Sequence, residues 1–84
     1  MAGKTLADLL PYLSRHGDVY EPDGKAQAAY VVASRYVIEY RGHTVTGVTG
    51  DFLTVETPYT GTRHVRLAEL SWEHVHVYKR MVNW

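Results

Sequence analysis

Two histidines one residue apart, His74 and His76, have the spacing in this sequence that most directly suggests chemistry. Alternate side chains of an extended strand point to the same face, so both imidazoles would lie together. His64 falls on the neighbouring segment, and three nitrogen ligands form a set that zinc accepts. The sequence has no HExxH motif and no carboxylate at a diagnostic spacing, so we expect neither a metal nor another cofactor. At an interface, these histidines would make association sensitive to pH between about 6 and 6.5.

Basic side chains in the second half of the chain offer another kind of chemistry. A patch of cations and aromatic rings can neutralise phosphates and stack single-stranded bases. The chain carries nine basic and nine acidic residues, so its formal net charge is zero and no overall field attracts nucleic acid. We therefore treat nucleic-acid binding as an alternative. Its candidate residues are Arg63, Arg66, Lys79 and Arg80, with Tyr59 and Tyr78 nearby.

Nucleophilic catalysis and phosphate binding lack their usual motifs. The chain has no cysteine, and Ser14, Ser34 and Ser71 all lie outside a Gly-x-Ser-x-Gly motif. No glycine-rich loop is followed by lysine, so we expect no enzymatic activity. With no disulfide and no apolar run long enough for a signal peptide or a membrane span, we expect a cytoplasmic protein.

Most of the aromatic surface ends in a polar group, because the chain has seven tyrosines and two tryptophans but one phenylalanine. Such side chains are enriched at protein interfaces, especially in loops and near chain ends. The structural alternative is that Trp72 closes one end of the fold and Trp84 packs over an N-terminal helix. We expect the protein-binding residues to be Trp72, Trp84, Tyr59, Tyr78, His74 and His76.

The first part of the chain has the pattern of helices. Leucines at helical spacing after Thr5 predict a helix over residues 5–15, ended by Gly17. Pro11 costs about 3 kcal/mol inside a helix, so this helix would begin late or kink. Residues 18–24 contain turn-forming residues and are expected to connect two elements. The alanine-rich opening of residues 22–34 predicts a second helix, although Tyr30-Val31-Val32 also suits a strand.

From residue 35 onward, β-branched and aromatic residues alternate with polar ones between glycines. The centre of this region is the stretch 41–56, in which two Thr- and Val-rich runs pivot on Gly50-Asp51, as in a tight hairpin. The predicted strands are 36–41, 43–49, 52–57, 62–67 and 73–80. Alternation directs one set of side chains inward, namely Leu53, Val55, Val65, Leu67, Val75 and Val77.

Residues 36–80 resemble the small-barrel group that includes SH3-like and Sm-like folds. The resemblance rests on the strand 36–40, on Gly42 and Gly47 separated by four residues, and on Asp51 followed by Leu53 and Val55. Residues 64–70 and 74–78 are similar to the fourth strand, one-turn helix and fifth strand of such barrels. The RNA site of Sm proteins is not carried over, because Thr54-Val55 and Leu70-Ser71-Trp72 replace its Asn and its Arg-Gly pair.

These patterns predict an α+β fold in a single domain over residues 1–84. It would contain a helical part over 1–34, a five-stranded antiparallel small barrel over 35–80 and a tail over 81–84. We expect a non-enzymatic protein that binds a larger protein or complex as a regulator or inhibitor, of the kind that phages and mobile elements use against host machinery, including CRISPR nucleases. The alternative is an Sm-like oligomeric RNA-binding protein. An open edge strand of the barrel would also allow self-association.

Overall fold

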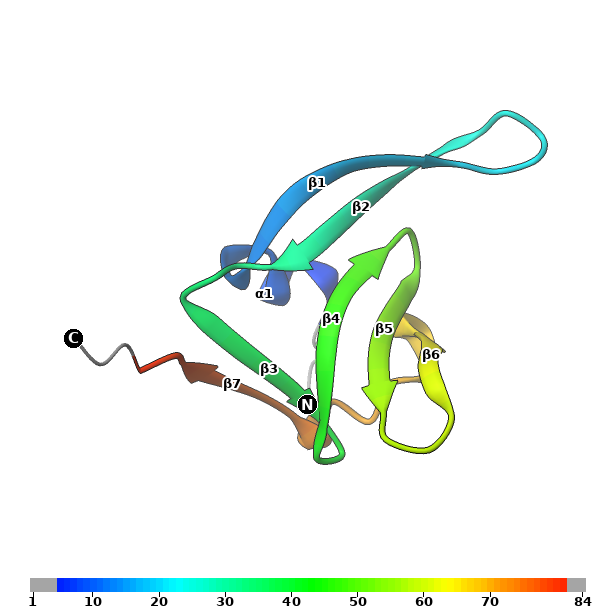
Figure 1. Ribbon diagram of the computed structural model, residues 1–84. Coiled ribbons are helices and arrows are strands. Elements are labelled where there is room, and N and C mark those ends of the chain that lie inside the picture. The colour runs from blue at the N-terminus through cyan, green and yellow to red at the C-terminus, as the bar shows by residue number, and fades with distance from the viewer. Residues whose placement is uncertain (1–4, 82–84) are drawn as a thin grey trace.

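Within residues 5–81, which the computed structural model describes, seven antiparallel strands join into one sheet (Figure 1). Short helical turns precede the first strand and the last one. In chain order the elements are α1 (Leu6–Leu9), η1 (Leu10–Tyr12), β1 (Leu13–Tyr20), β2 (Ala26–Val32), β3 (Tyr36–Tyr40), β4 (His43–Thr49), β5 (Phe52–Thr57), β6 (Gly61–Arg66), η2 (Leu67–Glu69), η3 (Trp72–His74) and β7 (Val75–Lys79).

Strand β4 is the centre of the sheet because it pairs with three other strands. One of its edges pairs with β5. The other edge is shared, since its first half pairs with β3, with Val45 opposite Ile38, and its second half pairs with β2, with Gly47 opposite Val31. The register with β5 shifts at this change of partner, as in a β-bulge. The β1–β2 hairpin is therefore joined to the rest of the sheet through β4.

Gly47 is the residue that lets β2 approach β4. A Cβ atom at this position would overlap the carbonyl oxygen of Tyr30 and would lie 3.3 Å from the carbonyl carbon. Both atoms belong to the backbone, so no side-chain rotation could relieve the overlap. Only glycine allows the two strands to come this close.

The β1–β2 hairpin extends beyond the rest of the sheet as an arm (Figure 1). Its turn is closed by hydrogen bonds from the amide of Glu21 to the carbonyl of Lys25 (2.8 Å) and from the amide of Gly24 to the carbonyl of Glu21 (2.9 Å). Gly24 has a φ of 88°, which glycine adopts without strain. The connector predicted over residues 18–24 is confirmed for residues 21–24, which form a turn between two strands, and is wrong for residues 18–20, which belong to β1 and pair with β2.

The predicted helix over residues 22–34 is wrong, because these residues form the end of the arm and β2. Local propensity favoured a helix through Ala26, Ala28 and Ala29, but β2 is paired on both sides, with β1 and with β4. Tyr30 and Val32 pack against the core, while Val31 points away from it. Tertiary pairing has overridden helix propensity here.

The predicted helix over residues 5–15 is also wrong beyond its first turns. α1 has one turn, and η1 contains Pro11 in its first two positions. Proline cannot donate to the α-helical ladder and clashes with the carbonyl four residues earlier, so the helix tightens and then becomes extended at Leu13. Gly17 lies in β1, beside a bulge, and does not end a helix. No helix in the described part of the chain is long and apolar enough to cross a membrane.

All five strands predicted after residue 35 are confirmed, with ends that differ by at most two residues. The predicted closed barrel is wrong. β3 to β7 follow the order β7-β3-β4-β5-β6, but β6 pairs with β5 alone and no ladder joins it to β7, so the sheet is open. The segment between β6 and β7 forms η2 and η3, and it inserts Leu70 into the core instead of completing a ladder. The α+β class is replaced by a mainly antiparallel β-sheet.

The core lies on one face of the sheet. Ile38, Val48 and Leu53 are completely buried, and Leu9 of α1 covers them together with Leu70. The predicted inward side chains are confirmed, since Leu53 and Val55 are buried and the others pack against the same cluster, namely Val65, Leu67, Val75 and Val77. The helical turns therefore cover this face of the sheet.

Replacing Gly47 with alanine tests the close approach of β2 and β4. We expect Gly47→Ala to lower the free energy of unfolding by about 1–3 kcal/mol, because the added methyl group overlaps backbone. Thr44→Ala, at an exposed position on the same strand, should change it by less than about 0.5 kcal/mol. Urea denaturation measures both values, and a Gly47→Ala variant as stable as the parent would contradict the described approach.

Candidate functional site

The aromatic residues predicted to bind protein lie in different environments. Tyr59 is 96% exposed in the loop between β5 and β6, and Tyr78 on β7 is half exposed. Trp72 in η3 is partly buried and packs against the core, as the structural alternative expected. Trp84 lies outside the described residues. Tyr59 and Tyr78 therefore lie on separate elements, the β5–β6 loop and β7, and Tyr78 has its ring centre 6.4 Å from that of His76.

The three histidines considered for zinc do not come together. His64 lies on β6, where its Nδ1 is 3.3 Å from the hydroxyl of Thr54 and its ring meets the edge of Phe52. His74 and His76 lie on η3 and β7, at the other edge of the sheet. Among residues 5–81, no group of three or more histidine, cysteine, aspartate or glutamate side chains is placed to hold a metal ion.

The four basic residues considered for nucleic acid also lie apart. Arg63 and Arg66 are three residues apart on β6 and so point to opposite faces of the sheet. Arg63 lines a pocket beside Val55 and Val65, whereas Arg66 stacks on Phe52 with its guanidinium carbon 5.6 Å from the ring centre. Lys79 and Arg80 lie at the end of β7, on the far edge. These cations do not form one continuous surface.

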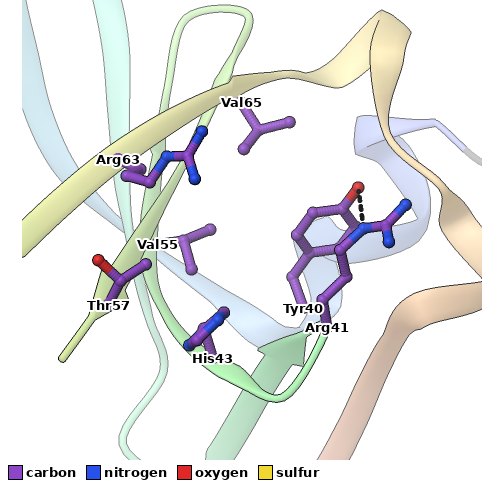
Figure 2. A pocket seen from close by; sticks show the side chains of 7 residues that line it. All are labelled: Tyr40, Arg41, His43, Val55, Thr57, Arg63 and Val65. Carbon is purple, nitrogen blue, oxygen red and sulfur yellow. Dashed lines mark hydrogen bonds between the residues drawn. The ribbon is translucent and has the colours of Figure 1, made fainter. Parts of the chain in front are cut away.

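Two other features of the described residues have the shape of binding sites. The first is a cavity of about 320 Å³ that we call the basic pocket. Figure 2 shows Arg63 and His43 on either side of Val55, across the pocket from the ring of Tyr40. Its lining residues are Tyr40, Arg41, His43, Val55, Thr57, Arg63 and Val65.

Arg41 is held in an unusual backbone conformation beside the basic pocket. It forms the two-residue turn between β3 and β4 with Gly42, and both residues have positive φ, 52° and 82°. Such turns favour Asn-Gly, and a positive φ is uncommon for a long side chain. The guanidinium is fixed by hydrogen bonds to the hydroxyls of Ser71 (3.0 Å) and Tyr40 (3.4 Å).

The hydroxyl of Tyr40 is the polar centre of this arrangement. The side chain is only 8% exposed, and its oxygen accepts hydrogen bonds from the Ser71 amide (3.2 Å) and the Arg41 guanidinium. Burial by itself would raise the pKa of Tyr40. The hydrogen bonds and positive charge of Arg41, with the hydrogen bonds from Ser71, outweigh burial and lower that pKa below its ordinary value.

The second feature is a groove between the arm and the sheet, on the face opposite the core. Two adjoining hollows of about 410 and 270 Å³ share Val19 and Thr49. Strand pairing places Ala29, Thr49 and Phe52 in one row across β2, β4 and β5. The residues of this arm groove are His16, Val19, Glu21, Gln27, Ala29, Tyr30, Val31, Thr46, Gly47, Thr49, Phe52, Thr54 and His64.

Most residues of these two sites were missed at the sequence level. Arg63 and His64 were candidates, but Val19 and Val31 were assigned to a connector and a helix. The dipeptide Arg41-Gly42 could have been noticed in the sequence. Asparagine is the usual residue at the first position of such a two-residue hairpin turn, so an arginine there indicates that its side chain makes contacts elsewhere in the fold.

No protein-family model, curated protein or solved structure matches this chain. The resemblance of residues 36–80 to SH3-like and Sm-like barrels therefore stays a prediction.

The lowered pKa of Tyr40 predicts how the protein titrates in alkali. We expect Tyr40 to ionise at a lower pH than an ordinary tyrosine, whose pKa is about 10, and Tyr40→Phe to remove that early ionisation. Since the folded-state pKa lies below the unfolded-state value, the folded protein loses this proton first. The stabilisation from Tyr40 therefore grows as pH rises through the folded-state pKa and is complete above the unfolded-state value.

Phenolate absorbance during a pH titration measures the ionisation. Tyr59→Phe is the matched control, because it removes an exposed tyrosine and should leave the early step in place. An early step that survives in Tyr40→Phe would contradict the described hydrogen bonding.

Proposed function

We propose that this chain is a non-enzymatic binding protein that recognises another protein through the arm groove, as a regulator or inhibitor of a larger complex. The observation that carries this proposal is the sheet face across β1, β2, β4, β5 and β6. No helical turn of residues 5–81 packs on it, because those turns pack against the core on the other face. A hollow face beside a protruding hairpin is a shape suited to an extended polypeptide segment.

The lining of the groove indicates the chemistry of the partner segment. Val19 is 49% exposed and faces the larger hollow with Phe52. Glu21 lines the same hollow, and the ion pairs among residues 5–81 leave it without a cation. We therefore propose that the partner inserts an apolar side chain near Val19 and places a lysine or arginine near Glu21.

Nucleic-acid binding has less support from the geometry. Base stacking along a strand needs cations and rings on one surface, but Arg63 and Arg66 point to opposite faces and Lys79 lies at the other edge of the sheet. Self-association is a separate expectation, since β1, β6 and β7 each pair on one side only within the described residues. Light scattering would detect it as a mass that is a multiple of the monomer's.

The test compares a groove variant with a variant elsewhere on the surface. Tagged parent, Val19→Glu and Tyr59→Glu would each be incubated in a bacterial lysate, with and without nuclease, and the retained proteins identified. We expect one partner to be retained by the parent and by Tyr59→Glu, and to be lost from Val19→Glu by at least about tenfold, because a buried unpaired carboxylate opposes binding.

The opposite pattern would overturn the groove. If Tyr59→Glu loses the partner and Val19→Glu keeps it, the contact lies at the loop between β5 and β6. If retention depends on RNA or DNA and ends with nuclease treatment, the protein-binding proposal is wrong and the nucleic-acid alternative replaces it. Both variants should keep the parent's melting temperature within a few degrees, since both positions are exposed.

A further inference from the structure

β7 is an edge strand whose outer side has no neighbouring strand within residues 5–81. It pairs with β3 alone, at the edge of the sheet remote from the arm (Figure 1). The strand Val75–Lys79 contains no proline, and its register with β3 is unbroken. A regular edge without these protective features favours pairing with a further strand.

The other two edge strands are less suited to such pairing. β1 has a register shift between Arg15 and Gly17, and a bulge of this kind twists an edge and interrupts pairing. β6 carries Arg63, His64 and Arg66 and no acidic residue, so two copies of β6 would bring positive charges together. β7 is therefore the edge that best accepts another strand.

The hydrogen bonds between β7 and β3 define which backbone groups are free on the outer side. At one end of this pairing the amide of Arg41 donates to the carbonyl of His74 (3.2 Å), and at the other the amide of Arg80 donates to the carbonyl of Arg35 (2.8 Å). Hydrogen-bonded and non-hydrogen-bonded pairs alternate along an antiparallel ladder. The even-numbered residues of β7 therefore direct their N–H and C=O groups to β3.

The odd-numbered residues of β7, Val75, Val77 and Lys79, direct the same groups to the open edge. A second copy in antiparallel orientation satisfies these groups when Val77 lies opposite Val77 of the other copy. Val75 then lies opposite Lys79 on both sides of a two-fold axis. This register pairs all five residues of the strand.

On the core face, the second copy would meet apolar surface and an acidic group. A hollow of about 280 Å³ beside β7 is lined by Asp8, Leu9, Tyr12, Trp72, Val75 and Val77. Val77 of the second copy lies next to Val77 and covers part of this apolar surface. Lys79 of the second copy lies opposite Val75, beside the hollow that Asp8 lines. The ion pairs within residues 5–81 include neither Asp8 nor Lys79, so these charges are complementary across the axis.

On the opposite face, β7 presents two aromatic rings. His76 and Tyr78 are exposed, and their ring centres are 6.4 Å apart. In the same register, His76 lies opposite Tyr78 of the second copy, so the four rings form one cluster. Cross-strand aromatic pairs of this kind stabilise a sheet.

We infer that β7 pairs with β7 of a second copy of this chain, in antiparallel orientation about a two-fold axis at Val77. The two sheets then form one continuous sheet with an arm at each end. No residue of β7 lines the arm groove, so this inference does not rest on the proposed protein partner.

Sedimentation equilibrium of the full-length protein measures the association. Five residues from each strand make a small interface, so we expect a monomer–dimer equilibrium with a Kd on the order of 100 µM. Val19→Glu, in the arm groove, should associate like the parent, which separates this inference from the proposed function. A chain that stays monomeric at about 1 mM would overturn the inference and would leave the edge of β7 to a strand of a different protein.

Isotope-filtered NMR on a mixture of labelled and unlabelled protein identifies the paired strands. The Cα atoms of a non-hydrogen-bonded antiparallel pair are about 4.5 Å apart, so we expect intermolecular contacts between the Hα atoms of His76 and Tyr78. Intermolecular contacts at β1 or β6 in place of these would overturn the inference.

Exchanging the two charges tests the register. Lys79→Asp should weaken association by about fivefold or more, because it places two carboxylates together at two equivalent positions. Adding Asp8→Lys to Lys79→Asp should restore the affinity to within about twofold of the parent's, since the opposite charges meet again.

Lys25→Asp is the matched control, because it makes the same change of net charge at an exposed position in the turn of the arm. It should change the affinity by less than about twofold, as expected for a distant screened charge. Lys79→Asp and Lys25→Asp both alter exposed residues and should keep the parent's melting temperature within a few degrees. Equal weakening by both variants would show that the contact is not at β7.

Discussion

The close contact between the backbone of β2 and Gly47 of β4 is the constraint on which the rest of the structure depends. The Tyr30 carbonyl occupies the place where any other residue at position 47 would have its Cβ. Because of this contact, β2 and β3 share one edge of β4, and the β1–β2 hairpin becomes an arm anchored to the sheet. The arm groove follows directly, since Gly47 and Ala29 are buried beneath it and leave room above.

The strands after residue 35 could be predicted because their signal is local. β-branched residues alternate with polar ones around Gly50-Asp51, and the resulting hairpin places Leu53 and Val55 in the core. Residues 26–32 could not be assigned in the same way. Their alanines favour a helix in isolation, and only pairing with β1 and β4 makes them a strand. Sheet closure is equally non-local, because it depends on whether β6 pairs with β7. Here the segment between them forms η2 and η3 and contributes Leu70 to the core, and β6 stays unpaired on that side.

The candidate sites were also difficult to predict, because they are formed by residues that lie far apart in the sequence. Sequence reasoning selected the tryptophans and tyrosines for their chemistry, but Trp72 serves the core and Tyr59 stands alone in a loop. The groove forms only when the arm and the sheet meet. For the basic pocket, one residue could have been noticed in the sequence, namely Arg41 at a turn position that favours asparagine. Arg41 adopts a positive φ there, and its guanidinium is hydrogen-bonded to Tyr40 and Ser71.

The measurement that tests the fold beneath both sites most directly is an NMR search for backbone contacts between strands. The structure requires cross-strand contacts for the pairs Ala29–Thr49 and Val31–Gly47, in the same molecule as contacts between Val45 and Ile38. Helix-type contacts over residues 26–32, or cross-strand contacts between β6 and β7, would contradict it. The first result would remove the arm and its groove, and the second would restore a closed barrel.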